Sequence, residues 1–345
     1  MSEHNSPTPA PLLTIIMPVY NVARYLDEAI ASVTAQTITD WELIIVDDGS
    51  TDGSSEICDR HAVSDNRIRV IHQKNSGVSA ARNAALEKAR GSIVGFIDGD
   101  DTIEPDMYES MIKTMQQTGA EIVVCGYVAE WKSRSRVKLP GLPDRWIGRD
   151  EAMKELLHND RIESMLWDKI YRREVITSKL PVGISYCEDL GVMYRWMNNI
   201  TRLATVEQPL YHYRMRKSSA INNPSARPRI GRLKVEIERV RFYLTQNYCG
   251  ISEGDLAAKI VTSAVGAAKY IARYCGKAET EVAFAEIRSL ADGWYKKAVE
   301  MKSVGDKTKR RYGRLMKSPG LFRLTMKGGR LLQPSRIRKE NDRFE

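Results

Sequence analysis

Hydrophobic positions in the first 130 residues follow two alternating patterns. Continuous apolar runs rich in β-branched residues are typical of buried strands, and the stretches between them repeat apolar residues every three or four positions, as helices do. The predicted strands are 12–19, 41–46, 68–72, 93–97 and 121–128, and the predicted helices are 22–36, a helix ending near 61, 78–90 and 106–118. Regular alternation of strand and helix predicts an α/β fold, a three-layer sandwich around a parallel sheet with right-handed crossovers.

The pattern changes after Trp131. Residues 132–148 are basic and rich in Pro and Gly without clear periodicity, which predicts a mobile loop. Short helices at 149–158 and 190–199 and a returning strand at 202–216 follow. Three helical stretches (230–248, 253–274 and 280–301) then predict a helical C-terminal appendage. We divide the chain into a lead-in (1–11), an α/β domain (12–217, with halves 12–130 and 131–217), a helical region (218–304) and a tail (305–345).

Composition narrows the class of protein. The 345 residues contain no apolar run near the ~20 residues that a membrane-spanning helix needs. Residues 1–11 are polar and Pro-rich without an apolar stretch, which indicates a disordered lead-in and not a signal peptide. Five cysteines occur singly, without a C-x-x-C pair, which favours reduced thiols over a zinc site or a disulfide framework. Together these features predict a cytoplasmic protein.

The excess of positive over negative charge lies in the tail of the chain. Residues 305–345 hold 13 basic and 4 acidic side chains, which leaves 40 of each sign in the rest of the chain. Tyr312, Leu315, Phe322 and other apolar residues are interleaved with this charge, as in segments that lie on an anionic bilayer. Nucleic-acid binding and a solvated extension are the alternatives. We favour peripheral attachment to the inner face of the cell membrane, without a nucleic-acid partner.

The densest candidate chemistry follows the strand at 93–97. Asp98, Asp100 and Asp101 fall within four residues at its carboxyl end, the edge where ligands bind in open α/β sheets. Three carboxylates so close raise each other's pKa unless a cation lies between them. Oxygen ligands of this kind suit Mg²⁺ or Mn²⁺ held together with substrate phosphates. The alternative is a polar turn in which Asp100 or Asp101 caps the following helix.

The ends of the other predicted strands carry matching groups. Tyr20 and Asn21 follow the first strand, Asp48 the second, and Arg82 lies on the helix after the third. An aromatic ring, a carboxylate, an Arg and a metal cluster are the groups that would bind a nucleoside diphosphate. Singly, Tyr20 could fill the core, Asp48 could cap a turn and Arg82 could be solvated. No G-x-G-x-x-G or P-loop motif is present, so dinucleotide and P-loop folds are not indicated.

The order and spacing of these segments resemble those of the inverting family 2 glycosyltransferases, which have the GT-A fold. The resemblance is specific over about residues 12–110, weaker to about 219, and absent from the last third. The matching segments are Ile16–Asn21, Gln36–Thr37, Val46–Gly53, Asn75–Asn83, Asp98–Asp101, Trp167–Lys169, Cys187–Asp189 and Tyr211–Arg216.

The resemblance implies a role for each matching residue. The segment with Pro18, Tyr20 and Asn21 would bind the donor, with Tyr20 stacked on the base. Asp48 would contact the base and Asp98 the ribose. Asp100 would bind Mn²⁺ or Mg²⁺ as in the family's D-x-D motif, with Asp101 as the alternative ligand. In the pair Glu188-Asp189, Asp189 would be the catalytic base; the alternative is a helix start that uses both carboxylates for dipole contacts.

The acceptor side would lie in the second half of the domain. Trp167 and Lys169 are the candidates there, with a buried Trp and a solvated Lys as the alternative. Arg214 or Arg216 could add charge near the leaving group. The expected enzyme is a metal-dependent inverting hexosyltransferase that moves a sugar from a UDP-sugar to a hydroxyl of an envelope or exopolysaccharide glycan. A lipid-linked glycan is one expected form of that acceptor. A nucleotidyltransferase or a non-catalytic binding module is the rival, and the donor sugar, linkage and oligomeric state are left open.

Overall fold

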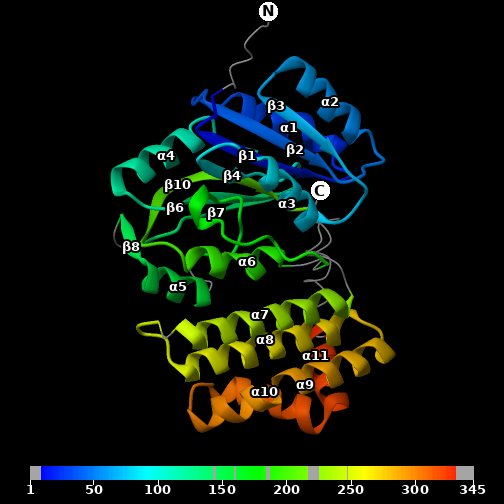
Figure 1. The fold of residues 1–345 in the computed structure, drawn as a ribbon. Helices are drawn as coiled ribbons and strands as arrows, with labels where there is room; N and C mark the ends of the chain where they lie inside the picture. Colours follow the sequence, from blue (N-terminus) through cyan, green and yellow to red (C-terminus); the bar gives the residue numbers. More distant parts are fainter. Residues whose placement is uncertain are drawn as a thin grey trace, which may run out of the picture.

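The structure is a computed structural model that describes residues 9–142, 145–158, 161–183, 187–216, 225–246 and 248–331. The first eight residues of the predicted lead-in, residues 332–345 of the predicted tail and the predicted boundary at 217/218 lie outside the described residues. Figure 1 shows an α/β domain above a layer of helices that follows it in sequence.

Strands and helices alternate through the first half of the chain, as the hydrophobic pattern predicts. The strands are β1 (Leu13–Val19), β2 (Trp41–Asp47), β3 (Ile68–His72), β4 (Ile93–Phe96), β5 (Thr102–Ile103), β6 (Ile122–Trp131), β7 (Arg134–Lys138), β8 (Trp146–Gly148), β9 (Lys169–Arg172) and β10 (Arg202–Arg214). The helices are α1 (Ala23–Thr34), α2 (Ser54–Ser64), α3 (Val78–Lys88), α4 (Met107–Thr118), α5 (Arg149–His158), α6 (Glu188–Met197), α7 (Ala226–Gln246), α8 (Glu253–Tyr274), α9 (Lys277–Glu300), α10 (Asp306–Lys317) and α11 (Pro319–Leu331).

One mixed sheet runs through the α/β domain in the order β3-β2-β1-β4-β9-β6-β10-β5, with β7 paired to β6 and β8 to β10. The first four strands are parallel, and β10 is parallel to β6. β9 is antiparallel to both of its neighbours, β4 and β6. The prediction of a purely parallel sheet is therefore wrong. The right-handed crossover rule concerns connections between parallel strands, so it does not apply to β9, although α5 precedes this strand.

Helices cover both faces of the sheet, which confirms the predicted three-layer sandwich (Figure 1). Ile15 and Met17 of β1 pack into one apolar core with α1, α2 and α4. Ile16, between them, packs into a second core with α3, α5 and α6. Successive side chains of a strand point to opposite faces, so a strand buried on both faces is apolar throughout. The unbroken apolar runs in the sequence have this origin.

The predicted loop at 132–148 contains regular structure. Its described residues include β7, which pairs antiparallel with β6, and β8, which pairs with β10. The prediction of a mobile loop is wrong here. Arg and Ser alternate along most of β7, so the strand forms through backbone pairing and leaves no hydrophobic period in the sequence.

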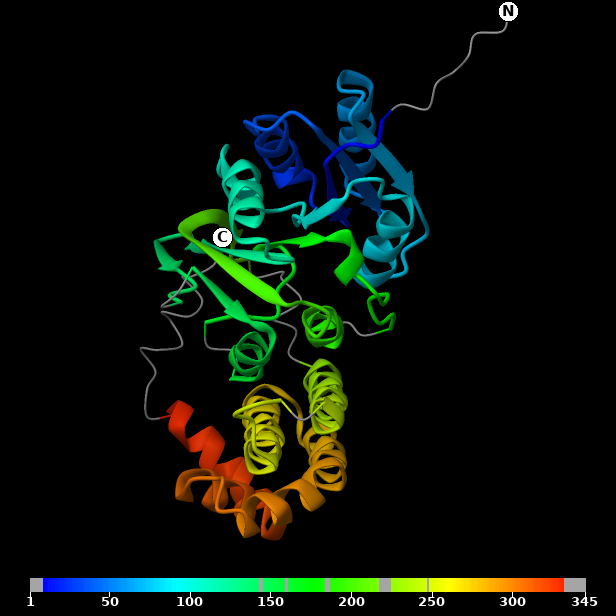
Figure 2. The same cartoon turned by 60° about the vertical axis from the view of Figure 1, so that its left-hand side comes forward.

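The helical region consists of α7, α8 and α9, close to the three predicted helices, followed by α10 and α11 (Figures 1 and 2). Ser252 and Asp255 form a capping box at the start of α8. In the tail, Tyr312, Leu315 and Phe322 are fully buried in the core shared with α8 and α9. The apolar residues expected at a bilayer are thus partly used for packing. Over the described residues, no helix is both long and apolar enough to span a membrane.

Candidate active site

A cleft of about 430 Å³ opens at the carboxyl ends of β1, β2 and β4. It brings together seven of the residues singled out from the sequence. They are Pro18, Tyr20, Asp48, Arg82, Asp98, Asp100 and Glu188. Parallel strands end at the same edge of a sheet, so loops far apart in sequence meet there. The predicted convergence at the strand ends is therefore confirmed for Tyr20, Asp48, Arg82, Asp98 and Asp100.

Arg82, on α3, holds three carboxylates together. Its Nη2 donates to Asp98 Oδ1 at 2.8 Å, and its Nη1 donates to Glu188 Oε1 at 3.0 Å and to Asp189 Oδ1 at 2.7 Å. The guanidinium is buried, and the three carboxylates raise its pKa against the opposing effect of burial. The solvated alternative for Arg82 is wrong. Its contact with phosphate stays a prediction.

Glu188 and Asp189 occupy the first turn of α6. The preceding residue, Cys187, has a left-handed φ of 65°, a strained conformation that turns the chain into the helix. The expected dipole contact at the helix start is therefore present alongside the ion pairs with Arg82. Burial raises the pKa of Asp189 to about 7 against the lowering effect of Arg82, with Glu188 and Asp98 adding to the rise. A carboxylate with such a pKa can accept a proton near neutral pH.

Asp48 is buried at the end of β2 and binds the start of α3. Its Oδ1 accepts from Gln73 Nε2 at 2.6 Å and from the Ser76 amide at 2.8 Å, and its Oδ2 accepts from the Gly77 amide at 2.8 Å. The capping alternative for Asp48 is therefore correct, and the residue also lines the cleft. Gly49 has φ +76°, and a Cβ there would meet the Asn75 amide nitrogen at 2.9 Å, so the turn after Asp48 needs Gly.

Tyr20 projects at the mouth of the cleft with 51% of its surface exposed, so it does not fill the core. Asn21 follows it with a left-handed φ of 51°. The Asn21 side chain accepts from the Thr51 amide at 2.8 Å, which ties the loop after β1 to the loop after β2. Asn21 is not among the described residues that line the cleft, and its donor contact stays a prediction.

Asp100 and Asp101 have different surroundings. Asp100 lines the cleft, where its carboxylate pairs with Arg216. Asp101 is buried behind it; its Oδ2 accepts from the Tyr211 hydroxyl and its Oδ1 from the Arg214 amide, both at 2.8 Å. Burial raises the pKa of both aspartates, and the neighbouring carboxylates add to the rise, as the repulsion argument predicts. Asp101 thus anchors β10.

Asp100 fits a cation site in which substrate supplies the other ligands. In the described part of the chain, no three His, Cys, Asp or Glu side chains are grouped so as to hold a metal ion. Mg²⁺ is commonly held by one or two carboxylates together with substrate phosphates, so a single cleft carboxylate is compatible with that chemistry. Burial raises the pKa of Asp100 although Arg216 beside it acts in the opposite direction.

Trp167 and Lys169 are both buried beside the sheet. Trp167 stacks on Tyr211 and Tyr213 with ring centroids 4.3 and 5.3 Å apart. Lys169 Nζ lies 2.5 Å from Asp168 Oδ1. The alternative of a buried Trp is correct and that of a solvated Lys is wrong. Contact of either residue with an acceptor stays a prediction.

Sequence reasoning did not assign Tyr213 to the site and left Arg216 undecided. Both line the cleft. The alternation of aromatic and basic residues in the segment 211–216 was the available signal, because it places the aromatic side chains on one face of β10.

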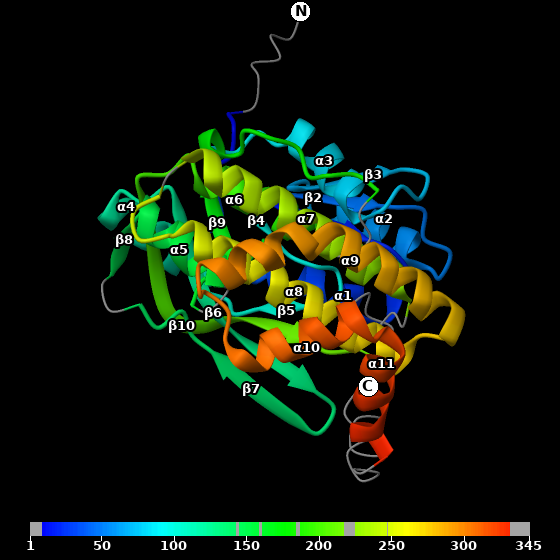
Figure 3. The ribbon, with the colours of Figure 1, turned by 90° about the horizontal axis from the view of Figure 1, so that it is seen from below.

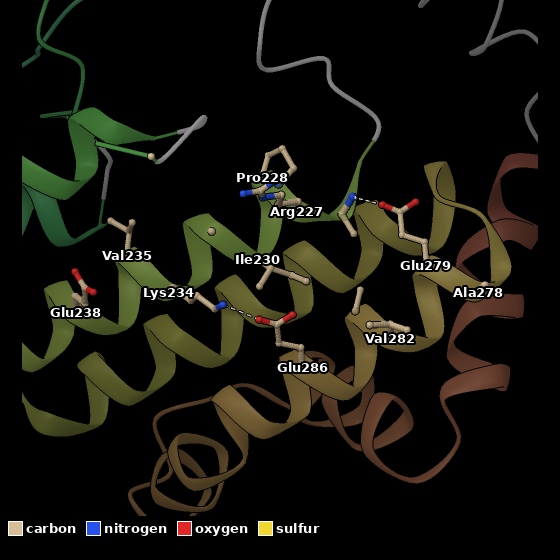
Figure 4. A pocket seen from close by; sticks show the side chains of 14 residues that line it. Arg227, Pro228, Ile230, Lys234, Val235, Glu238, Ala278, Glu279, Val282 and Glu286 are labelled. Atoms are coloured by element: carbon tan, nitrogen blue, oxygen red, sulfur yellow. Dashed lines mark hydrogen bonds and ion pairs between the residues drawn. The ribbon is translucent and has the colours of Figure 1, made fainter. Parts of the chain in front are cut away.

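A second cavity, of about 730 Å³, lies between α7 and α9 (Figure 4). Three of its charged residues have partners: Lys234 Nζ lies 2.7 Å from Glu286, and Glu279 accepts from the Ala226 amide at 2.8 Å. Ile230, Val235 and other aliphatic side chains form much of its wall. It contains none of the motif residues, so we assign the chemistry to the cleft at the strand ends.

Comparison with known proteins agrees with the fold and the motifs. The family model "Glycosyl transferase family 2" matches residues 14–176. The uncharacterized glycosyltransferase EpsJ of Bacillus subtilis is 32% identical over 253 residues, covering 71% of this chain and 74% of EpsJ. TuaG, a B. subtilis glycosyltransferase named for teichuronic acid biosynthesis, is 30% identical over 72% of this chain and 97% of its own. The chain therefore belongs to glycosyltransferase family 2.

Solved structures with a similar fold include that of TarS from S. aureus. One TarS structure has a TM-score of 0.63 at 15% identity and covers 92% of this chain and 55% of the TarS chain. Another, of TarS in complex with UDP-GlcNAc, has a TM-score of 0.56 at 18% identity. These likenesses support the predicted GT-A fold.

Proposed function

We propose that this glycosyltransferase acts with inversion, by direct displacement at the anomeric carbon of a nucleotide sugar. The observation that carries the proposal is the set of ion pairs from Arg82 to Asp98, Glu188 and Asp189. It joins Asp98, a candidate donor contact that lines the cleft, to Asp189, a candidate base with a raised pKa next to the cleft residue Glu188. A single displacement needs such a base for the acceptor hydroxyl, on the side of the sugar opposite the diphosphate.

The residues of the chain would divide the work as follows. Tyr20 stacks on the base, Asp98 contacts the ribose, and Asp189 accepts the acceptor proton as the new glycosidic bond forms. Arg216 and the positive end of α3 lie at the cleft and favour the charge of the departing diphosphate. When bound at Asp100, Mg²⁺ or Mn²⁺ would supply Lewis-acid stabilisation of that leaving group.

We propose a UDP-sugar as donor and a hydroxyl of an envelope or extracellular polysaccharide as acceptor. TarS, a neighbour in fold, has been solved with UDP-GlcNAc, so that donor is the first probe. The name of TuaG connects one relative to the synthesis of a polysaccharide. Both observations support the proposal through similarity, and the residues of the cleft provide the matching chemistry.

The test is donor binding and hydrolysis across UDP-, GDP- and dTDP-sugars, with and without Mn²⁺ or Mg²⁺. We expect one UDP-sugar to bind only with metal, and Asp100→Ala to weaken that binding by tenfold or more, about 1.4 kcal/mol. Asp40→Ala is the matched control, because it removes an exposed carboxylate that does not line the cleft. Absence of nucleotide-sugar binding under every metal condition would contradict the proposal.

We also propose that the protein lies on an anionic membrane surface through its tail. Leu321 and Leu324 of α11 are 52% and 69% exposed, and α10 before them carries six basic residues in its twelve positions. Deleting residues 305–345 would remove packed side chains from the core, so the sharper test is the double variant Leu321→Glu, Leu324→Glu. We expect this double variant to stay in the supernatant when anionic vesicles are sedimented, while its donor hydrolysis persists. Vesicle binding equal to that of the wild type would contradict the proposal.

A further inference from the structure

One face of β10, β6 and β7 carries an aromatic row beside a basic row. In the strand register, Tyr211 pairs with Tyr127 and Tyr213 with Ala129. Across the next ladder, Tyr127 pairs with Lys138, Ala129 with Arg136 and Trp131 with Arg134. Paired residues point to the same face of a sheet, and alternate residues of one strand share that face. The basic side chains therefore line the outer edge of an aromatic surface (Figure 3 shows β7 at the rim of the molecule).

This face continues from the donor cleft. Tyr213 lines the cleft and stacks on Trp167, and Trp167 meets Tyr127 edge to face with ring centroids 5.0 Å apart. Beyond Tyr127, a cavity of about 310 Å³ is lined by Tyr127, Ala129, Trp131, Arg136, Lys138 and Glu163. That volume lies at the lower end of the ~300–1,000 Å³ typical of ligand pockets. A chain-like ligand could occupy the cavity while its end reaches the cleft.

The cavity has an excess of positive charge. Glu163 accepts from the Tyr127 hydroxyl at 2.9 Å and pairs with Lys138 Nζ at 2.7 Å. The Arg134 guanidinium lies 4.4 Å from the centre of the Trp131 ring, a cation–π contact that orients the indole. Three basic groups thus face one carboxylate on this surface. Arg136, which is exposed, is positioned to meet an anionic ligand.

We propose that this face, which we call the ribbon face (Tyr127, Trp131, Arg134, Arg136 and Lys138), binds an acceptor glycan made of pyranose rings that carry carboxylates. The inference rests on the proposed function, because it names the acceptor class for the same active site. Aromatic rings pack on the apolar faces of sugar rings, and Arg pairs bidentately with carboxylates. The ribbon face offers both groups in adjacent rows.

Two other anionic polymers are the alternatives. A polyol phosphate offers charge without rings, so it would leave Tyr127 and Trp131 without a stacking partner. A single-stranded nucleic acid, whose bases could stack on the aromatic row, is the competing ligand that the test below separates from a glycan. A carboxylated oligosaccharide can place its charge on Arg136 at the open edge and its ring face on the aromatic row.

The test is binding of trigalacturonate to the full-length protein. Tryptophan fluorescence and calorimetry measure this binding, and UDP binding is measured on the same samples. Arg136→Glu and Trp131→Ala are the test variants. Lys113→Glu reverses one exposed charge on α4 and is the matched control. Maltotriose, a short polyphosphate and an oligothymidylate are the competing probes. We expect trigalacturonate to bind about tenfold more weakly to each test variant and unchanged to Lys113→Glu.

The outcomes separate the acceptor inference from the proposed function. Saturable trigalacturonate binding that exceeds maltotriose, polyphosphate and oligothymidylate binding, and that depends on Arg136 and Trp131, supports the ribbon face. Equal or tighter binding of any competing probe overturns the assignment to a carboxylated glycan. Trigalacturonate binding by the wild-type protein without UDP binding would reject the donor site alone. Normal UDP binding without trigalacturonate binding would reject the ribbon face alone.

Discussion

Arg82 Nη1 donates to Asp189 Oδ1 at 2.7 Å and joins α3 to α6 across 107 positions of sequence. The same guanidinium holds Asp98, which lines the cleft at the strand ends. The candidate base is therefore positioned by a side chain that also positions a candidate donor contact. A shift of one group changes the field at the other, because both carboxylates share one buried cation.

Replacing Asp189 with Asn should remove the base and keep the shape of the site. We expect sugar transfer to fall by about 10²–10⁴-fold, the usual contribution of a general base, with UDP affinity changed by less than about threefold. Glu188→Gln is the control, because Glu188 shares the ion pair with Arg82. Transfer rates that fall equally in both variants would argue that charge near Arg82 matters, and not proton acceptance by Asp189.

The pH dependence of transfer should follow the raised pKa of Asp189. A carboxyl with a pKa of about 7 is protonated below that pH and cannot then accept a proton. We expect kcat/KM to rise with pH up to about 7 and then to level off. The measurement is a kcat/KM profile from pH 5 to 9 at saturating metal. A flat profile from pH 5 upward would show that another group accepts the proton.

Replacing Arg82 with Met should destabilise the fold. Three carboxylates would lose their buried cation, and breaking a buried ion pair on one side typically costs about 3–5 kcal/mol. Lys179→Met is the matched control, since its ion pair with Glu87 is exposed and is expected to contribute little to stability. Urea unfolding gives the free energy for both variants. Equal losses would contradict a special role of the Arg82 cluster.

Tyr20→Ala should weaken donor binding without disturbing the fold, because the ring is half exposed. Stacking of a base on an aromatic ring contributes about 1–3 kcal/mol, so we expect UDP to bind at least about fivefold more weakly. Tyr20→Phe keeps the ring and should bind as the wild type does. Calorimetric titration with UDP measures both variants, and a loss of affinity in Tyr20→Phe equal to that in Tyr20→Ala would point to the hydroxyl instead of stacking.

Much of the fold was predictable because its determinants are local. The buried strands β1 to β4 carry their own apolar runs, and α1 has its own amphipathic period. Two features were not local. β7 has almost no hydrophobic pattern. β9 begins with Lys169, a buried charged residue that pairs with Asp168. Pairing with distant strands determines both elements.

The site was predictable to the extent that strand order placed its residues. Tyr20, Asp48, Asp98 and Asp100 meet because each follows a strand. The pairing of Arg82 with Glu188 and Asp189 could not be predicted from the sequence, because both residues lie more than a hundred positions away. The separate environments of Asp100 and Asp101 depend on β10, which supplies the hydroxyl and amide that bind Asp101.

The position of β9 limits how early in synthesis the sheet can be completed. β9 lies between β4 and β6, although it follows both in sequence. Until residues 169–172 have left the ribosome, β4 and β6 each keep an unpaired edge, and such edges promote association between nascent chains. The sheet can close only after about half of the protein has been made. A truncated chain that ends before residue 169 would therefore be prone to aggregate.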